Sequence, residues 1–218
     1  MSEKYQKTYP DLGFGLTLIS RCREAAKPEG FAPYRKKRLR KMRKRETLAQ
    51  ITQRIDTYDS FFQDFGYPCP LTQHLKRTVN SGFPMYSLFV DAHFMAEMCA
   101  GILVAVTDAD KFNGGLTLDV AEAGETCKGM GGRQFVMQDK EIVLRDEKEI
   151  VCVLCQGADE KTRVTKNTTN VLFYAYAVPG INKEHLEHGL SIAAETLAEF
   201  GGGKVEGVRI YGSSTDLL

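Results

Sequence analysis

The chain has 218 residues, of which 43% are hydrophobic and 26% charged, and its formal net charge is +1. This ordinary globular composition, in a chain long enough to bury its own core, excludes fibrous, collagen-like and wholly disordered proteins. The longest nearly apolar stretch, 94–106, contains Glu97 and is too short for a membrane span, and the first residues have no signal-peptide core. We therefore expect a cytoplasmic protein without a membrane partner.

The first half of the chain is expected to be mainly helical. A short strand is predicted over 14–23. Apolar residues at spacings of three and four then predict one long helix over 34–65. Two shorter helices are expected over 71–81 and 88–99.

After Gly101 the sequence changes to short β-rich segments separated by Gly, Asp and Lys. The expected strands cover 102–106, 116–121, 134–136, 142–144, 150–155 and 170–177. An amphipathic helix over 183–200 ends at three glycines, and 205–211 is a candidate edge strand. This order indicates an α+β fold with a layered β-sheet, an N-terminal helical extension and a C-terminal helix packed on the sheet.

The charge is strongly polarised along the chain. Nine of the eleven residues from 35 to 45 are basic and none is acidic, whereas the rest of the chain has 20 basic and 28 acidic residues. Such a run is either a solvated helix surface or an element that binds nucleic-acid phosphates, and the absence of compensating acids favours the second. The candidate contacts are Arg35, Lys36, Lys37, Arg38, Arg40, Lys41, Arg43, Lys44 and Arg45.

No metal and no cofactor are expected. The six cysteines are scattered, and Cys152 and Cys155 form a CxxC inside a predicted strand, where this spacing puts them on opposite faces. His185 and His188 have no further ligands nearby in the sequence. The glycine-rich loop 122–132 lacks the Gly-Lys-Ser/Thr of a phosphate-binding loop.

Two loops carry the polar groups that a site would need. The loop 122–132 contains Glu125, and the loop 157–172 is rich in hydroxyl and amide groups with carboxylates at one end. The glycines of the first loop, taken alone, favour a hairpin or a bulge, and the second loop is equally compatible with a solvated turn. No Ser/His/Asp order or Cys/His pair is evident, so any catalysis would depend on a positioned water.

Four short motifs in order resemble the tRNA-binding and editing domain of the phenylalanyl-tRNA synthetase beta chain, over about 76–200. They are Gly82-Phe83-Pro84 leading into Val90-Asp91, Asp108-Ala109-Asp110-Lys111-Phe112, Ala123-Gly124-Glu125-Thr126 and Thr168-Thr169-Asn170-Val171-Leu172. The resemblance implies the layered fold of that domain over 76–218, with 1–75 as an N-terminal extension, the two forming one compact unit.

The resemblance also implies an activity: hydrolysis of the ester in mischarged aminoacyl-tRNA by a freestanding protein, with the basic run holding the tRNA. It implies Glu125 and Asp159 as catalytic residues. Arg163 would face a phosphate or an oxyanion. The implied substrate-binding residues are Thr126, Arg163, Thr165, Thr168, Asn170 and Tyr174.

The sequence departs from the family's pattern at two positions, since Ala105 and Tyr174 stand where the synthetase has a histidine and a glutamate. Two alternatives therefore stay open: a non-catalytic RNA-binding protein, and a protein that binds a free amino acid in the same fold. The sequence does not indicate the amino acid, the tRNA, the oligomeric state or a role for Cys127, which we interpret as a packed thiol.

Overall fold

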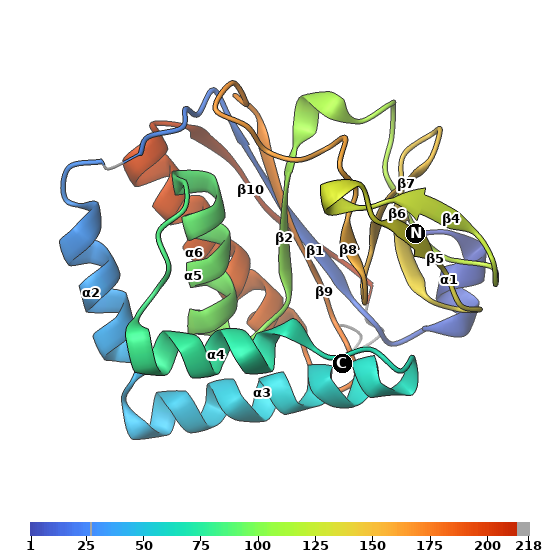
Figure 1. The fold of residues 1–218 in the computed structure, drawn as a ribbon, viewed down its shortest axis with the longest axis horizontal. Coiled ribbons are helices and arrows are strands. Elements are labelled where there is room, and N and C mark those ends of the chain that lie inside the picture. The colour runs from blue at the N-terminus through green and yellow to red at the C-terminus, as the bar shows by residue number, and fades with distance from the viewer. Residues whose placement is uncertain (27, 213–218) are drawn as a thin grey trace.

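Two antiparallel sheets pack face to face in the computed structural model, and helices cover the outer face of the larger sheet (Figure 1). The structure describes residues 1–26 and 28–212. The three layers are therefore helices, a four-stranded sheet and a second four-stranded sheet. The expected α+β class, with a layered sheet and a C-terminal helix packed on it, is confirmed.

The larger sheet has the strand order β10-β1-β9-β2. Its strands are β1 (Phe14–Ser20), β2 (Val104–Asp108), β9 (Val171–Tyr176) and β10 (Lys204–Tyr211). All neighbours are antiparallel, and β1 lies between β9 and β10. The candidate edge strand near the C-terminus is thus confirmed as β10, and the first 20 residues contribute a central strand to the sheet.

The smaller sheet has the order β3-β6-β7-β8 and carries a separate hairpin on its outer face. Its strands are β3 (Thr117–Val120), β6 (Ile142–Arg145), β7 (Ile150–Val153) and β8 (Gly157–Ala158), and the hairpin joins β4 (Thr126–Lys128) to β5 (Gln134–Val136). Because successive side chains alternate between faces, one face of this sheet joins the main core. The other face forms a small cluster around Phe135 and Val153.

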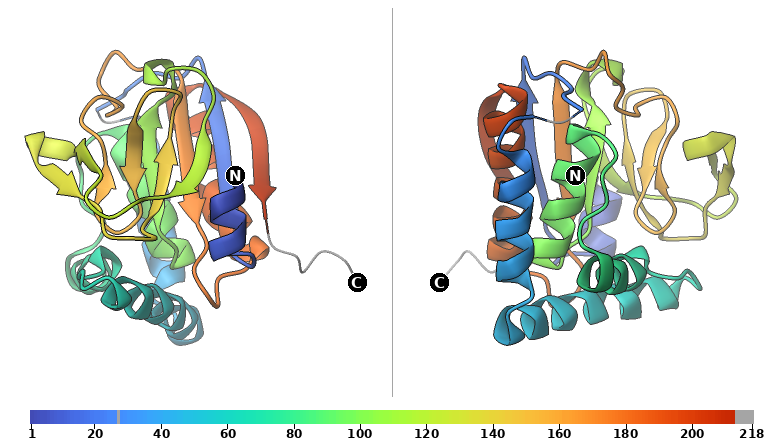
Figure 2. Two further views of the ribbon diagram at one scale, coloured as in Figure 1. Left: turned by 90° about the vertical axis from the view of Figure 1, so that its right-hand side faces the viewer. Right: turned by 60° about the vertical axis from the view of Figure 1, so that its left-hand side comes forward.

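The helices form a layer beside the larger sheet and a base beneath both sheets (Figure 2), except for the short first helix, which packs against β3 of the smaller sheet. They are α1 (Glu3–Thr8), α2 (Phe31–Met42), α3 (Arg45–Asp64), α4 (Pro70–Ser81), α5 (Leu88–Ala100) and α6 (Lys183–Gly201), with short 3-10 turns η1 (Ala109–Lys111) and η2 (Met130–Gly132). In the described part of the chain, no helix has the length and apolar character needed to cross a membrane.

The expectation of one helix over 34–65 is wrong, because the chain bends between α2 and α3. Lys44 has an extended backbone (φ −63°, ψ 136°) and interrupts the helical hydrogen bonds there. The apolar residues of α3, such as Ile51 and Phe62, are buried against α4 and the core, whereas Met42 of α2 is buried toward α5. One straight helix could not bury both sets of apolar residues. The bend also places the cations at the end of α2 near a helix C-terminus, where the helix dipole favours positive charge.

The short elements α1, β4 and β8 were not expected from the sequence, and the proposed division at 75/76 stays a prediction. β8 is only two residues long and exists through its pairing with β7. β7 also ends at Val153, two residues earlier than expected, which changes the surroundings of Cys155.

Candidate active site

A cavity of about 420 Å³ lies where β2, β7 and β8 meet the connection between α3 and α4. Its walls are mainly apolar, with one polar group of side chains from α4 and α5. The lining residues most relevant to chemistry are His74, His93, Glu97, Cys152, Cys155 and Tyr176. A cavity of this size can hold an amino-acid side chain with part of its ester.

Helix α5 brings two polar side chains to this wall. His93 and Glu97 are separated by four residues, so they lie on the same helix face. The helix ends at Gly101, whose φ of 68° turns the chain back, and a Cβ there would lie 2.9 Å from the Ile51 carbonyl oxygen. This tight turn places Val104, the first residue of β2, directly against both side chains.

Both backbone groups of Val104 contact α5. Its N–H donates to Glu97 Oε1 at 3.3 Å, and its carbonyl oxygen lies 2.8 Å from His93 Nε2. His93 Nε2 is also 3.4 Å from Glu97 Oε1. Together these contacts fix one oxygen of the Glu97 carboxylate in place.

The other oxygen of Glu97 faces His74 from α4. His74 Nδ1 lies 3.6 Å from Glu97 Oε2, and Glu97 itself is only 2% exposed. Burial alone would raise the pKa of Glu97, but the adjacent imidazoles of His93 and His74 lower it to about 2. Burial likewise opposes the His93 cation, yet the adjacent carboxylate raises the pKa of His93 overall. The cavity therefore contains an ionised, buried carboxylate.

The two thiols of the cavity are poor nucleophiles. Burial raises the pKa of Cys152 to about 11, and it raises the pKa of Cys155 further. Both thiols line the same cavity because the strand ends before Cys155, so the expectation that they lie on opposite faces is wrong. Since a thiol reacts as its thiolate, neither provides an activated nucleophile.

Glu125 does not line the cavity, although Met130 of the same loop does. Glu125 accepts hydrogen bonds from Arg145 Nη2 at 2.7 Å and from the Glu122 N–H at 2.8 Å. Partial burial opposes its ionisation, but the Arg145 hydrogen bond lowers the pKa of Glu125. Thr126 is exposed at the start of β4, and Cys127 is a half-buried thiol whose pKa burial raises to about 11.

The second predicted catalytic residue, Asp159, is 4% exposed and serves a local turn. Its Oδ1 accepts from the Thr162 N–H at 3.1 Å and from the Thr162 hydroxyl, and burial raises its pKa. Arg163 is exposed and pairs with Glu160 at 2.8 Å. These contacts order the loop rather than direct charge toward the cavity.

The remaining predicted substrate-binding residues bind neighbouring parts of the fold. Thr168 Oγ1 accepts from the Thr165 N–H and donates to buried Asp108 at 2.7 Å. Asn170 donates to Asp110 at 2.8 Å and accepts from the Arg21 N–H. Asp108 and Asp110 belong to one of the motifs that carry the resemblance, so two of these motifs meet here.

Tyr174 is fully buried in β9, and its ring lies 5.8 Å from that of Tyr176. Tyr176, two residues along the same face, is the tyrosine that lines the cavity. None of the eight predicted catalytic and substrate-binding residues, all within the described chain, is among the cavity's lining residues. Their predicted roles remain untested.

Sequence reasoning missed His74, His93 and Glu97. One signal was present: Glu97 interrupts an apolar stretch and follows a histidine by one helical turn. His74 comes from a different helix, and no local pattern shows that it lies beside Glu97. Among the described residues, no group of three or more His, Cys, Asp or Glu is arranged to hold a metal ion.

The basic run forms α2 and the bend that follows it. Three of its arginines contact the fold: Arg35 donates to the Phe83 carbonyl at 2.6 Å, Arg38 to Glu195 at 3.0 Å, and Arg43 to the carbonyls of Thr78 and Val79. The other six cations are exposed and form no ion pair with the described residues. They are Lys36, Lys37, Arg40, Lys41, Lys44 and Arg45.

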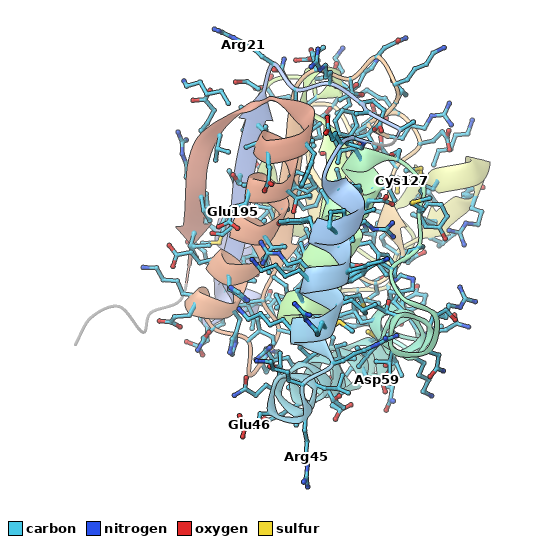
Figure 3. All side chains as sticks on the ribbon, turned by 90° about the vertical axis from the view of Figure 1, so that its left-hand side faces the viewer. Arg21, Arg45, Glu46, Asp59, Cys127 and Glu195 are labelled. Atoms are coloured by element: carbon cyan, nitrogen blue, oxygen red, sulfur yellow. The ribbon has the colours of Figure 1, made fainter. Side chains whose placement is uncertain are left out.

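The basic helix and the cavity lie on different sides of the molecule. Helix α2 packs against α5, and Arg38 reaches Glu195 of α6, whereas the cavity opens beyond β2, on the side of the smaller sheet. In Figure 3, Arg45 extends away from the molecule below the bend, and Glu195 lies on α6, next to α2. A ligand that used both features would have to reach from one side of the molecule to the other.

The match to a known family decides where this fold belongs. Residues 68–202 match the model of the B3/4 domain, which covers more than half of the chain. The chain belongs to the B3/4 domain family. The match includes α4, α5 and every strand except β1 and β10, and it therefore includes His74, His93, Glu97 and every other lining residue of the cavity except Phe62.

Similar proteins include beta subunits of phenylalanine–tRNA ligase. The subunit from Ralstonia nicotianae is 31% identical over 97 residues, and that from Mycoplasma genitalium is 26% identical over 95 residues. Each alignment covers 44% of this chain and 12% of the subunit, so the chain matches about one eighth of these relatives.

A solved structure is also similar. It is an N-terminal fragment of the phenylalanyl-tRNA synthetase beta subunit from Pyrococcus horikoshii, with a TM-score of 0.49 and 15% identity over 93% of this chain and 48% of the fragment. The resemblance to the synthetase beta chain that the sequence motifs indicated is confirmed at the level of the domain family.

Proposed function

We propose that this chain is a tRNA-binding esterase that acts on aminoacyl-tRNA, with the aminoacyl group in the cavity and the tRNA backbone on α2. The observation that carries the proposal is the ionised Glu97 carboxylate, buried between two histidines in the wall of a mainly apolar cavity. A buried charge is costly to the fold. Clusters of perturbed titratable groups in a cavity are therefore more frequent at functional sites than elsewhere.

The relatives support this substrate class. They are subunits of an enzyme that joins an amino acid to tRNA, and the segment matched to the family includes every lining residue of the cavity except Phe62. Six exposed cations on and after α2 supply phosphate contacts that a nucleic acid needs. A tRNA is longer than a domain of this size, so its backbone can lie on α2 while its 3′ end reaches the cavity.

The test is deacylation of a panel of tRNAs, each charged beforehand with a correct or an incorrect amino acid, by the purified protein. We expect release of a restricted set of amino acids. Ala105 lines the cavity and lies on the same face of the sheet as its cross-strand partner Tyr174. Ala105→Phe should therefore obstruct the cavity and reduce release at least tenfold.

Ala123→Phe is the matched control, because Ala123 is exposed in the loop before β4 and lies outside the cavity. It should leave release unchanged, and thermal melting should show that both variants fold. Absence of release from the whole panel would overturn the esterase. In that case, salt-sensitive binding of uncharged tRNA would identify an RNA-binding protein, and binding of a free amino acid that Ala105→Phe abolishes would identify an amino-acid-binding protein.

A further inference from the structure

We infer that His74 is the general base of the hydrolysis and that Glu97 is the residue that positions it. The inference takes its substrate, aminoacyl-tRNA, from the proposed function. It adds which residues carry out the hydrolysis of the ester. The two side chains come from different helices of the family's domain, α4 and α5, and meet at the cavity wall.

The two oxygens of the Glu97 carboxylate have different surroundings. Its Oε1 contacts the Val104 N–H and His93 Nε2, which hold the group to the end of β2. Its Oε2 is buried and has no hydrogen bond within the described structure. A carboxylate with a purely structural role would be expected to have both oxygens bonded, because an unsatisfied buried acceptor is costly. One oxygen is therefore left for a second partner.

That partner is His74. Its Nδ1 is also buried and without a hydrogen bond among the described residues, and it lies 3.6 Å from Glu97 Oε2. Such contacts between catalytic groups are often long without substrate and shorten when substrate binds. With Nδ1–H directed at the carboxylate, Nε2 is the nitrogen that can accept a proton. The side chain is 31% exposed, and its ring packs 4.9 Å from the ring of Phe94.

The other titratable groups of the cavity are less suited to act as the base. His93 is held by its Nε2 to the Val104 carbonyl, and its Nδ1 is buried. The thiols of Cys152 and Cys155 stay protonated at neutral pH because they are buried. Among the described cavity residues, His74 is thus the imidazole that has a carboxylate partner but no hydrogen bond to the backbone, and its side chain is more exposed than that of His93, 31% against 20%.

The step balances without any further reactant. His74 Nε2 takes a proton from water as the water oxygen bonds to the ester carbonyl carbon, and the imidazolium that forms is stabilised by Glu97. Collapse of the tetrahedral intermediate breaks the bond to the ribose oxygen of the tRNA, which receives the proton from His74. The products are the free amino acid and a tRNA with a free 3′-terminal hydroxyl.

The experiment uses two substrates with the full chain: a charged tRNA from the panel above, and 4-nitrophenyl butyrate as an ester probe without tRNA. We expect His74→Ala to lower kcat about 100-fold or more on both, since general-base catalysis contributes about 10²–10⁴. Added imidazole should restore part of the rate. Gln73→Ala, an exposed neighbour on the same helix, is the control and should be unaffected.

A loss of stability in a Glu97 variant would not distinguish positioning of His74 from a structural role, so the test of Glu97 uses the kinetic constants. Glu97→Gln should lower kcat with little change in KM, and the double variant His74→Ala/Glu97→Gln should lose no more than His74→Ala alone, because residues that act as one unit are not additive. Glu97→Asp should recover part of the rate. Additive losses in the double variant would overturn the positioning role.

Failure of the inference and failure of the proposed function give different results. If charged tRNA is cleaved and His74→Ala cleaves it within threefold of the wild type, the inference is overturned and the esterase function stands. If only the nitrophenyl ester is cleaved and cleavage needs His74, the tRNA function fails and the inference stands. If neither substrate is cleaved, both are overturned.

Discussion

Ala105 lies directly opposite Tyr174 in the antiparallel pair of β2 and β9. These are the two positions at which the sequence departs from the synthetase pattern, so the two departures form one local change on a single face of the sheet. A methyl group and a buried phenol occupy these two positions. The charged groups of the neighbouring cavity come instead from α4 and α5.

The first prediction concerns pH and the His93–Glu97 pair. Burial disfavours the His93 cation, but Glu97 raises the pKa of His93 overall. The stabilisation by His93 is therefore fully present below its unfolded pKa, near 6.5, and disappears as pH rises through the higher folded value. The loss of unfolding free energy caused by His93→Gln, measured by urea unfolding, should be larger at pH 6 than at pH 9.

His188 provides a control in which the expected pH dependence of the stability change has the opposite sign. Burial and the nearby cations Lys41, Arg54 and Arg38 lower its pKa, so the folded state disfavours the protonated ring. His188→Gln should therefore be less harmful, relative to the wild type, at pH 6 than at pH 9. An equal effect of His93→Gln at both pH values would show that the His93 cation does not stabilise the fold.

Much of the fold could be predicted because the spacing of apolar residues within each segment indicates which face is buried. The periodic apolar residues of α3 and α6 and the β-rich segments around β6 and β9 are local patterns, and burial follows from them. The bend at Lys44 could not be predicted in this way. It depends on where α5 and α4 lie, and these positions are set by contacts distant in sequence.

The site was harder to predict than the fold for a physical reason. Glu125 and Asp159 stand out in the sequence because they lie in polar loops, yet such carboxylates commonly bind nearby N–H and hydroxyl groups. Asp159 does this with Thr162. His74 and Glu97 lie within helices that look like ordinary core segments, and their meeting depends on how α4 crosses α5.

The second prediction concerns tRNA binding by the six free cations on and after α2. Binding of uncharged tRNA should weaken about 10³-fold between roughly 50 and 200 mM salt if all six contact phosphates. The triple variant Lys36→Glu/Lys37→Glu/Arg40→Glu should bind more weakly and reduce the slope of log K against log salt by about 2–3.

The matched control changes the same net charge elsewhere. The exposed lysines Lys7, Lys148 and Lys166 lie on other elements, and their replacement by Glu leaves α2 intact. This control should keep most of the affinity and of the salt slope. If both triple variants weakened binding equally, the affinity for tRNA would depend on the net charge of the protein and not on contacts with α2.

The third prediction separates structural from exposed cations in the basic run. Arg35 donates to the carbonyls of Phe83 and Pro84, and its guanidinium lies 5.6 Å from the Phe31 ring centre. Arg35→Ala should lower the free energy of unfolding by about 1–3 kcal/mol, because charged hydrogen bonds to partly buried carbonyls are lost. Lys37→Ala should change it by less than about 0.5 kcal/mol. Urea unfolding of the two variants checks this, and equal values would contradict it.

The fourth prediction places Gly189 of α6 at a close helix contact. A Cβ there would lie 2.4 Å from Cδ1 of Ile102 and 3.2 Å from Cβ of Ala100. Alanine favours a helix over glycine by about 1 kcal/mol, but overpacking a core costs about 1–3 kcal/mol. Gly189→Ala should therefore lower thermal stability. Glu187→Ala, at an exposed position of the same helix, should not. A rise in melting temperature for Gly189→Ala would show that α5 and α6 separate easily.

The last prediction distinguishes the loop carboxylate from the cavity. Glu125 is bonded to Arg145, which also contacts Asp119 at 2.9 Å, so these three side chains join the loop before β4 to β3 and β6. The pair is about one-third exposed and partly screened by solvent, so Glu125→Gln should cost only about 0.5–1 kcal/mol of unfolding free energy. Because Glu125 does not line the cavity, the same variant should keep its deacylation rate within about threefold, whereas His74→Ala loses it. A large loss of rate in Glu125→Gln at unchanged melting temperature would instead assign the chemistry to this loop, as the sequence motifs predicted.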